Sequence, residues 1–467
     1  YFDNEGKKDF VVAETAEEAL KLAQEKNANI KAEDLEQESD CLDTWFSSWL
    51  WPISLFDGIN NPGNEEIKYY YPTSDLVTGP DIIFFWVARM IMAGCEYMKE
   101  IPFRNVYFTG IVRDKLGRKM SKSLGNSPDP LMLIEKFGAD GVRMGLMLAA
   151  PAGNDILYDD SLCEQGRNFN NKIWNAFRLV KGWEVADIEQ PEYAKTAVKW
   201  FEAVLNKTLA EVDDLFGKFR LSEALMAVYK LFWDEFSSWY LEMVKPAYGK
   251  PVDRATYEAT LGFFDALLRL LHPFMPFITE EIWQALPHEG KYLISAKWPE
   301  YQDELNFPTE EAQMEMLMES IRAIRNRRAE MNVPPSKKAQ VYVVTENAAR
   351  QEVFTEGEAC FLKLAYASAL NVSAEAPADA AKMVSVVTGD VQMYLPMNEL
   401  VDFEKEKARL NKELKKAQKD LDFINKKLNN PGFLNKAPEQ VVEGERVKAA
   451  KLNDQIAKLN ESIAALN

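Results

Sequence analysis

The chain has 467 residues, of which 47% are hydrophobic and 12% aromatic, and its formal net charge is −18. This composition excludes global disorder, and the length predicts about three domains. The four cysteines lie far apart with no Cys-x-x-Cys pair, which argues against a zinc knuckle and against a secreted disulfide framework.

The first 40 residues predict a small element of their own. Residues 10–13 predict a strand, and Thr15 with Glu18 three residues later predicts a capping box that opens a helix through about Lys26. Residues 27–40 are polar and acidic, which favours a linker.

Residues 41–148 have an α/β pattern. Residues 76–79 predict a buried strand that meets a turn, 81–100 an apolar helix, and 105–111 another strand. A further helix is expected to begin near Leu131, after Pro128 and Pro130. Because strand and helix alternate, we expect a parallel, doubly wound sheet with ligands at the carboxyl ends of its strands.

From residue 160 to about 286 the periodicity becomes helical. Four or five segments with short loops predict an α-helical bundle. The clearest positions at helical spacing are Leu221, Leu225, Val228, Leu231, Phe232, Phe236 and Tyr240, and residues 253–271 and 276–286 continue the pattern. Thr279 or a neighbour is expected to cap the last of these helices.

Residues 314–400 predict a small α+β module. An arginine-rich helix over 314–331 is followed by a strand over 339–344, and residues 384–387 and 391–395 predict a hairpin around Gly389-Asp390.

The last segment has two heptad runs, which predict an antiparallel coiled-coil hairpin. The runs are separated by Asn430-Pro431-Gly432 and Ala437-Pro438. Their apolar positions are Leu410, Leu414, Ala417, Leu421, Ile424 and Leu428, then Leu452, Ile456, Leu459, Ile463 and Leu466. Residues 401–467 carry 14 Lys and Arg against 11 Asp and Glu, a net +3 that leaves −21 on the remainder.

The most informative motif is Lys-Met-Ser-Lys-Ser at residues 119–123, between Gly117 and Gly125. Two lysines on a short glycine-flanked loop suit a transient polyphosphate charge, and Ser121 and Ser123 add hydroxyl donors. The alternative for an arbitrary lysine pair is a solvated basic loop. Five consecutive residues in this order behind a predicted strand favour the phosphate role for Lys119 and Lys122.

This loop resembles the signature loop of class I aminoacyl-tRNA synthetases. Asp43-Thr44-Trp45-Phe46-Ser47-Ser48 and the block from Gly79 to Met90 resemble further segments of that family in its valyl form. The chain departs from the family at Pro80, where a bulky residue is usual. The resemblance implies ATP contacts at Lys122, Met120 and Gly110, and an amino-acid pocket lined by Trp45, Asp81 and Ile82.

The resemblance also implies tRNA contacts. Residues 168–176 and 271–283 resemble an anticodon-binding bundle, in which they mainly determine the fold. Arg322 and Arg325 on the basic helix, and Lys412 and Lys416 on the first heptad helix, are candidate phosphate contacts, with a solvated face as the alternative. The block Gly138 to Arg143 resembles one that follows the signature loop, either as a helix surface with an internal ion pair or as its support.

Only two histidines are present, His272 and His288, so the family's His-x-Gly-His motif is missing. We therefore expect the C-terminal part of a valyl-type synthetase, without the editing domain and inactive by itself. The intact enzyme would use ATP with Mg²⁺ and no zinc, would charge valine tRNA and edit threonine, and would be a cytoplasmic monomer without a membrane partner. The alternatives are an isoleucyl or leucyl relative, a tRNA-binding module without catalysis, or a heptad scaffold.

The expected domains follow the motifs. They are the exit of an inserted domain (1–40), a partial Rossmann-type catalytic domain (41–158), the anticodon-binding bundle (159–312), the small α+β module (313–400) and the coiled-coil arm (401–467).

Overall fold

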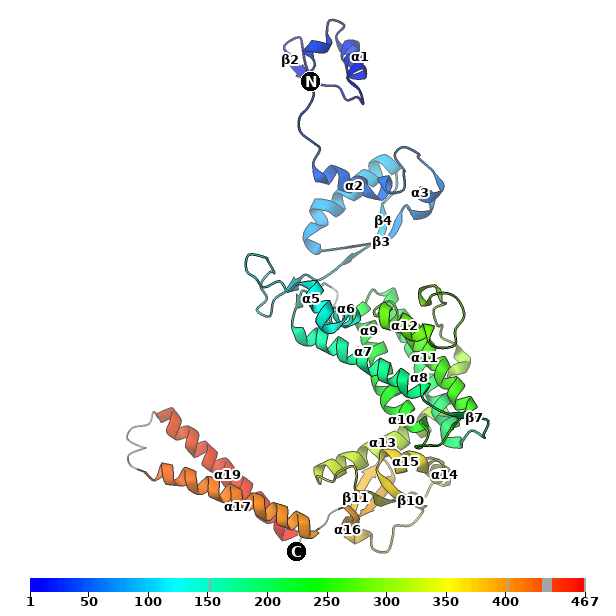
Figure 1. Ribbon diagram of the computed structural model, residues 1–467, viewed down its shortest axis with the longest axis vertical. Helices are drawn as coiled ribbons and strands as arrows, with labels where there is room; N and C mark the ends of the chain where they lie inside the picture. The colour runs from blue at the N-terminus through cyan, green and yellow to red at the C-terminus, as the bar shows by residue number, and fades with distance from the viewer. Residues whose placement is uncertain (151–152, 401–402, 431–438, 466–467) are drawn as a thin grey trace. The chain divides into compact units, whose positions relative to one another are not determined.

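The computed structural model describes residues 1–150, 153–400, 403–430 and 439–465 (Figure 1). These residues form two compact units. One contains residues 1–128 and 149–159, and the other contains 129–148 and 160–467. The segment 129–148, which we expected within residues 41–158, thus packs with the helical unit.

The N-terminal segment is a short hairpin followed by a helix. Glu5 and Gly6 both have positive φ, the conformation that a tight hairpin turn requires. The prediction of a strand at 10–13 is wrong. Phe10 and Val12 are exposed, and the two strands of this segment lie earlier in the sequence, at 2–4 and 7–9. The elements are β1 (Phe2–Asn4), β2 (Lys7–Asp9), α1 (Ala16–Lys26) and η1 (Ala32–Asp34).

The predicted cap of α1 is half correct. The Thr15 hydroxyl accepts a hydrogen bond from the Glu18 amide at 3.2 Å. The Glu18 carboxylate, however, accepts from the amide of Glu14 at 3.3 Å rather than from that of Thr15.

Parallel strand pairing is confirmed, but in pairs rather than in a wide sheet. β3 (Thr73–Thr78) pairs with β4 (Phe103–Phe108), and β5 (Val112–Arg113) pairs with β6 (Ile156–Leu157). The burial expected for β3 is wrong: Val77 is 61% exposed, because the only strand that pairs with β3 among the described residues is β4.

The connection from β3 to β4 is helical, as predicted, but it is irregular. Two π-helical stretches interrupt it, and α2 packs against it. The elements of this part are α2 (Thr44–Ser54), α3 (Glu65–Tyr70), η2 (Pro80–Ile82), η3 (Ile83–Val87), α4 (Ala88–Ala93) and η4 (Gly94–Met98).

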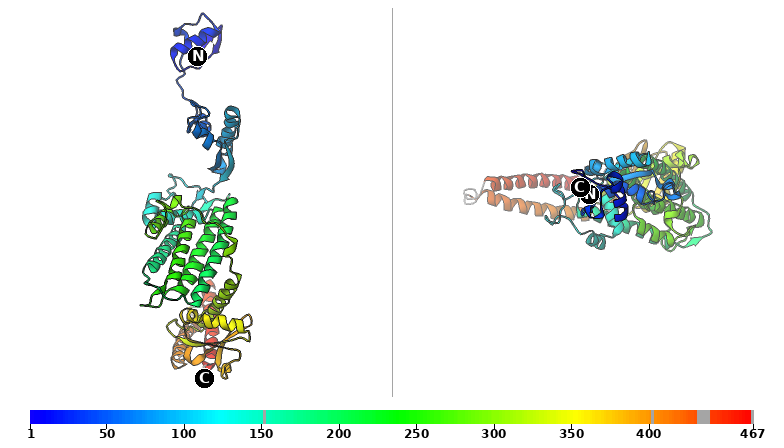
Figure 2. Two further views of the ribbon diagram at one scale, coloured as in Figure 1. Left: turned by 90° about the vertical axis from the view of Figure 1, so that its right-hand side faces the viewer. Right: turned by 90° about the horizontal axis from the view of Figure 1, so that it is seen from above.

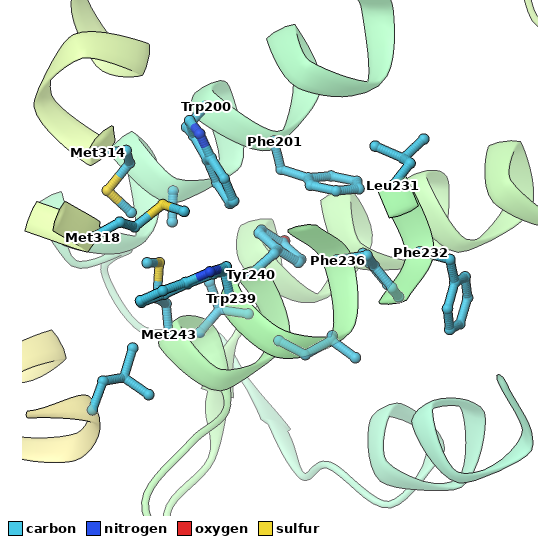
Figure 3. Close-up of a cluster of buried hydrophobic side chains, with 14 of the residues drawn as sticks. Trp200, Phe201, Leu231, Phe232, Phe236, Trp239, Tyr240, Met243, Met314 and Met318 are labelled. Atoms are coloured by element: carbon cyan, nitrogen blue, oxygen red, sulfur yellow. The ribbon is translucent and has the colours of Figure 1, made fainter. Parts of the chain in front are cut away.

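The helical unit contains the largest core. In both Figure 1 and Figure 2 the long helices α7, α8 and α11 lie side by side. The Phe201 ring lies 5.2 Å from those of Phe236 and Tyr240, measured between centroids (Figure 3). The helices are α5 (Pro130–Phe137), α6 (Ala139–Leu148), α7 (Asp160–Lys181), α8 (Glu192–Gly217), α9 (Leu221–Lys230), η5 (Leu231–Tyr240), α10 (Leu241–Val244), α11 (Arg254–Leu271) and α12 (Pro276–Gln284).

The predicted bundle helices are confirmed, with one difference at residues 231–240. These residues form η5, a π-helix rather than a regular α-helix. Short pieces complete the unit: β7 (Val185–Ala186) pairs with β8 (Val252–Asp253), and η6 (Leu293–Ser295) and η7 (Asp303–Leu305) precede the next long helix.

Helices α6 and α7 cross at backbone contact. A Cβ atom on Gly145 would lie 2.3 Å from the Leu162 carbonyl oxygen, and one on Gly166 would lie 2.1 Å from that of Gly141. No side chain fits at these distances, so glycine at these positions permits the close crossing.

Helix α6 also holds the corner between α11 and α12. The buried Asp140 carboxylate accepts hydrogen bonds from the amides of Phe277 (3.3 Å) and Ile278 (2.7 Å), in the first turn of α12. The Arg143 guanidinium donates to the carbonyls of Pro273 and Phe274, both at 3.1 Å, just after α11 ends. One helix thus satisfies donors at one end of the corner and acceptors at the other.

This arrangement corrects the cap predicted at Thr279. That residue lies inside α12, where its hydroxyl donates to the Met275 carbonyl at 2.8 Å and contacts His272 Nδ1 at 2.8 Å. Burial lowers the pKa of His272. The hydroxyl proton is already used on Met275, so Nδ1 carries a proton and donates to Thr279.

The small module is a four-stranded sheet in the order β10-β9-β12-β11. The predicted strand at 339–344 and the predicted hairpin are confirmed, with Gly389 in the turn at φ +56°. Between them the sequence had not indicated β10, α14 or α15. The elements are α13 (Pro308–Glu330), β9 (Ala339–Val344), α14 (Ala348–Glu356), α15 (Glu358–Leu364), β10 (Ala367–Ser373), η8 (Ala380–Lys382), β11 (Met383–Thr388), β12 (Val391–Pro396) and α16 (Met397–Leu400).

The last two helices, α17 (Phe403–Leu428) and α19 (Glu439–Ala465), pack along each other. Ala417 contacts Leu452 and Ile456, and Lys427 lies 3.7 Å from Glu445, so the two helices run antiparallel. The predicted turn at 431–432 and 437–438, and Leu466, lie outside the described residues.

We predict that Asp140→Ala destabilises the helical unit by about 1–2 kcal/mol, because it leaves two amides in the first turn of α12 without their side-chain acceptor. Chemical denaturation followed by circular dichroism measures this free energy of unfolding. The control is Asp187→Ala, which removes an exposed carboxylate paired with Arg254 at 2.5 Å and should cost clearly less, because solvent screens this pair. Equal losses in the two variants would contradict the capping role.

Candidate functional site

The carboxyl ends of β3 and β4 bring three of the predicted site residues to one edge. Thr78 and Phe108 are register partners at these ends, and the Thr109 amide donates to the Thr78 carbonyl at 2.9 Å. Asp81 and Ile82 begin the helix after β3, and Gly110 follows β4. The carboxyl edge of parallel strands is where such folds bind ligands.

Close backbone packing requires glycine at position 110. A Cβ atom at this position would lie 1.8 Å from the Asn154 carbonyl oxygen. The next amide, that of Ile111, donates to the Asp155 carboxylate at 3.1 Å, and Arg113 pairs with the same carboxylate. Segment 154–157 thus aligns the start of the signature loop, a contact that sequence reasoning had missed.

Trp45 lies in a cluster of aromatic and cationic side chains. Asp43 caps α2 by accepting from the Trp45 amide at 2.7 Å. The Arg89 guanidinium lies 3.8 Å from the Trp45 ring centroid, and the Phe85 ring lies 5.7 Å from it. Arg89 also donates to the carbonyls of Phe84 and Phe85 in the π-helical stretch. Arg89 therefore fixes the Trp45 indole against η3, which begins next to Ile82.

The signature loop has a rigid base. The Asn126 amide donates to the Asp114 carboxylate at 3.0 Å and to the Lys119 carbonyl at 3.3 Å, while its oxygen accepts from the Ser121 amide at 2.9 Å. Asp114 also accepts from the amides of Leu116 and Arg118. The loop is closed across residues 114–126 by these two polar side chains.

Lys119 and Lys122 are both exposed on this closed loop. Ser121 Oγ lies 3.1 Å from Ser123 Oγ and accepts from the Leu124 amide at 3.3 Å. Met120 is half-buried. The structure therefore holds the backbone of the motif and leaves the two ammonium groups at the surface, where they can follow a mobile anion.

The Asp114 carboxyl has a pKa well below its usual range. The side-chain hydrogen bond from Asn126 is the main cause, and hydrogen bonds from Arg118 and Leu116 add to it. The pKa of Asp114 is lower in the folded state than in the unfolded state. The ionised carboxylate therefore stabilises the fold above the unfolded pKa, and this stabilisation is lost only as the pH falls through the folded pKa. At neutral pH the Asp114 carboxyl at the base of the loop is therefore ionised.

The α13 arginines that we predicted to contact phosphate already have partners within the protein. Arg322 pairs with Glu315 at 2.8 Å. Arg325 Nε donates to the Leu364 carbonyl at 2.5 Å, and its guanidinium lies 5.6 Å from the Trp239 ring centroid. Arg328, one turn further, is 3% exposed and donates to the Pro334 carbonyl at 3.1 Å. Sequence periodicity could not separate these roles.

Lys412 and Lys416 lie one turn apart on α17, and both are exposed. Ala417 and Leu414, by contrast, face α19. The two lysines therefore point away from the apolar seam, toward solvent.

Three segments of the chain match known families. Residues 2–159 match tRNA synthetases class I (I, L, M and V), and residues 198–343 match the anticodon-binding domain of tRNA ligase. Residues 402–467 match the valyl tRNA synthetase tRNA binding arm. The predicted order of a catalytic segment followed by a mostly helical anticodon-binding domain is thereby confirmed.

Curated relatives match over the whole chain. Valine–tRNA ligase of Phocaeicola vulgatus is 62% identical, and that of Parabacteroides distasonis is 60% identical; each match covers all of this chain and 52% of the relative. The enzyme of Bacteroides thetaiotaomicron is 58% identical with the same coverage.

The chain belongs to the valine–tRNA ligase family. It spans about half the length of the curated relatives it matches. The isoleucyl and leucyl alternatives are set aside, because these relatives and the arm family are both valyl.

None of the described helices combines the length and apolarity needed to cross a membrane. Among the described residues, no three or more His, Cys, Asp or Glu side chains are grouped so that they could hold a metal ion.

We predict that Asn126→Ala loosens the signature loop, because Ser121 and Asp114 each lose a hydrogen-bond partner. Amide exchange within residues 114–126, followed by hydrogen–deuterium mass spectrometry, should be about 10-fold faster, corresponding to roughly 1.4 kcal/mol of local stability. Asp129→Ala removes the cap of α5 and leaves the loop untouched, so it is the control. Unchanged exchange in Asn126→Ala would show that the loop is held by other contacts.

Proposed function

We propose that this chain provides the ATP-phosphate loop, part of the valine pocket and the tRNA-binding surfaces of a valine–tRNA ligase. The reaction joins valine to ATP, releases pyrophosphate, and then esterifies the 3′ end of valine tRNA. The observation that carries the proposal is the loop at 119–123, in which two exposed lysines extend from a base held by Asp114 and Asn126.

Adenylate formation requires positive charge close to the β- and γ-phosphates as they leave. The valine carboxylate attacks the α-phosphorus of ATP, and negative charge grows on the departing β- and γ-phosphates. Lys119 and Lys122 stabilise that charge, and Ser121 and Ser123 donate hydrogen bonds. Met120 and Gly110 line the same ATP site. Mg²⁺ arrives with the phosphates of ATP, and we assign it no protein ligand among the described residues.

Trp45, Asp81 and Ile82 form the part of the valine pocket that this chain supplies. The contacts of Trp45 with Arg89 and Phe85, and the position of Asp81 and Ile82 after β3, support this assignment. An apolar pocket rejects threonine only about 100-fold, a general figure for valine enzymes rather than a property of these residues. We therefore also propose that the complete ligase edits threonine.

The tRNA would contact the helical part of the chain. We propose that residues 159–312 bind the anticodon stem-loop and that the module at 313–400 supports them. The helices at 401–467 would form an antiparallel coiled-coil arm that reaches the tRNA corner. Arg322 and Arg325 on α13, and Lys412 and Lys416 on the arm, contribute phosphate contacts. The bond of Arg325 to the Leu364 carbonyl leaves its charge unpaired. Residues 1–40 and 41–158 are the exit of the inserted domain and the catalytic segment.

A second candidate function concerns the chain by itself. We propose that it binds tRNA without activating valine, and that the complete enzyme is a cytoplasmic monomer. The supporting observation is the size of the parallel sheets: each has two strands among the described residues, which is little of a nucleotide-binding sheet. Valine-dependent pyrophosphate exchange by this chain alone would contradict this proposal.

We predict that Lys122→Ala, in a ligase that contains the complete catalytic domain, slows valine-dependent ATP–pyrophosphate exchange by about 100-fold or more. Binding of valine tRNA should stay within about twofold, since the loop acts on the phosphates. Lys115→Ala is the matched control, because it removes the same charge from a loop lysine that pairs with Asp159 at 2.5 Å. An exchange rate as high as that of the control would refute the role of Lys122.

We predict that the double variant Lys412→Gln/Lys416→Gln binds valine tRNA more weakly and with less salt dependence. Loss of two phosphate contacts should reduce the slope of log affinity against log salt by about 1.8. Fluorescence anisotropy across a salt series measures both quantities. Lys448→Gln is the control, because this lysine pairs with Glu445 at 2.9 Å. An unchanged slope would mean that the arm does not contact phosphate at these lysines.

A further inference from the structure

A cavity of about 270 Å³ opens between α8, α11 and η7. Two polar side chains line it, Glu202 and Asn206, and both belong to α8. The volume lies slightly below the usual range of small-ligand pockets, so the cavity suits a ligand of a few heavy atoms. The rest of the wall consists of Val198, Leu205 and Leu209 of α8, Ala259, Gly262 and Phe263 of α11, and Leu305 of η7.

Glu202 is the unusual residue of this lining. It lies on the same stripe of α8 as Val198, Leu205 and Leu209, where helical spacing favours an apolar side chain. The side chain is half-buried, and among the described residues no donor or cation bonds to its carboxylate. Burial therefore raises the pKa of this carboxyl with no partner to offset the effect. A ligand that brings a positive charge would remove the cost of burying the ionised form.

Asn206 has a different role, because its side chain is used within the protein. It is 1% exposed, its amide nitrogen donates to the Gln302 carbonyl at 2.7 Å, and its oxygen accepts from the Gln302 amide at 2.9 Å. These bonds hold the segment that contains Leu305 against α8. The wall is therefore fixed without a ligand, and Glu202 is the polar group that remains available to one.

The α11 side of the cavity is open at Gly262. This residue is exposed, and a Cβ atom built on it would meet nothing within 4 Å among the described residues. Its neighbour Phe263 is 6% exposed and supplies an aromatic surface to the same wall. The cavity thus presents a small apolar surface beside a single negative charge.

We propose that this cavity binds a small aliphatic amine. The ammonium group donates to the Glu202 carboxylate, and the hydrocarbon chain packs against Leu205, Leu209 and Phe263. An amine is favoured by charge complementarity, because an alcohol would leave the carboxylate without a counter-charge and an acid would add a second negative charge. An amino acid is disfavoured for the same reason, since its own carboxylate would lie in the same small cavity.

This inference goes beyond the proposed function and does not depend on it. None of the residues that line the cavity is a proposed contact of ATP, of valine or of a phosphate of tRNA. Binding of the amine can therefore be measured on the chain itself, without pyrophosphate exchange and without tRNA.

The test compares three ligands of similar size: n-butylammonium, butan-1-ol and butyrate. Titrations followed by saturation-transfer difference NMR at neutral pH give each dissociation constant. We expect n-butylammonium to bind with a Kd of about 1 mM, since it has few heavy atoms, and butan-1-ol to bind about 10-fold more weakly. Butyrate should not bind.

Two pairs of variants locate the binding. Glu202→Gln should weaken n-butylammonium binding by about 10-fold and remove its advantage over butan-1-ol, because the charge-assisted bond is lost. Glu211→Gln is the matched control, since it removes the same charge from an exposed residue of the same helix. Gly262→Leu fills the open space and should weaken binding at least as much, whereas Gly262→Ala should change it little. Both Leu and Ala favour a helix over Gly, and thermal melting checks that each variant is folded.

Four results would overturn the proposal. The unsubstituted chain could fail to bind n-butylammonium, or it could bind the amine and the alcohol equally well. In the variants, unchanged amine affinity in Glu202→Gln would show that the carboxylate is not the partner. Unchanged amine affinity in Gly262→Leu would show that the amine binds outside this cavity.

Discussion

The junction between α6 and the α11–α12 corner is the interaction on which the helical unit depends. A corner between two helices exposes amides at the start of one and carbonyls at the end of the other, and burial makes each group costly if it is left unpaired. Asp140 and Arg143 satisfy both sets from a single helix. Because Gly145 and Gly166 bring α6 into backbone contact with α7, the same helix ties the corner to the rest of the core.

This junction also explains why the segment 129–148 packs with the helices, although it follows the signature loop in sequence. Its carboxylate and guanidinium have their partners in the first turn of α12 and in the turn before it, 130 to 138 residues away. The chain therefore leaves the signature loop and enters the helical unit within a few residues.

The sequence predicted what local signals determine. Period-3.6 patterns gave the bundle helices, the turn residues Gly389-Asp390 gave the hairpin, and five consecutive residues gave the signature loop. It could not predict Asp140 as the cap of α12, since capping is read from near neighbours, and Thr279 was the nearest polar residue. The bond from Arg325 to the Leu364 carbonyl could not be predicted either. The sequence of a basic helix is the same whether its cations contact solvent or a carbonyl distant in sequence.

Burial was the other quantity that periodicity misjudged. The apolar pair Leu76 and Val77 suggested a buried strand, yet Val77 is exposed because a strand is buried only by what pairs and packs with it. The π-helix η5 carries apolar residues at spacings that also suit an α-helix, so its extra residue per turn left no mark in the pattern.

The net charge of −18 is a poor guide to the partners of this chain. Part of its acidity is paired, as in Arg254–Asp187 and Lys207–Glu311, and such pairs add little to the field at a distance. A phosphate group interacts with the local arrangement of cationic side chains. Lys119 and Lys122 are exposed on a fixed loop, Lys412 and Lys416 face away from the seam of the arm, and Lys172 lies over the indole of Trp233. A cation positioned by a carbonyl, a seam or an aromatic ring keeps its full charge, whereas a neighbouring carboxylate offsets part of it. This distinction, rather than the total, determines where an acidic protein can bind RNA.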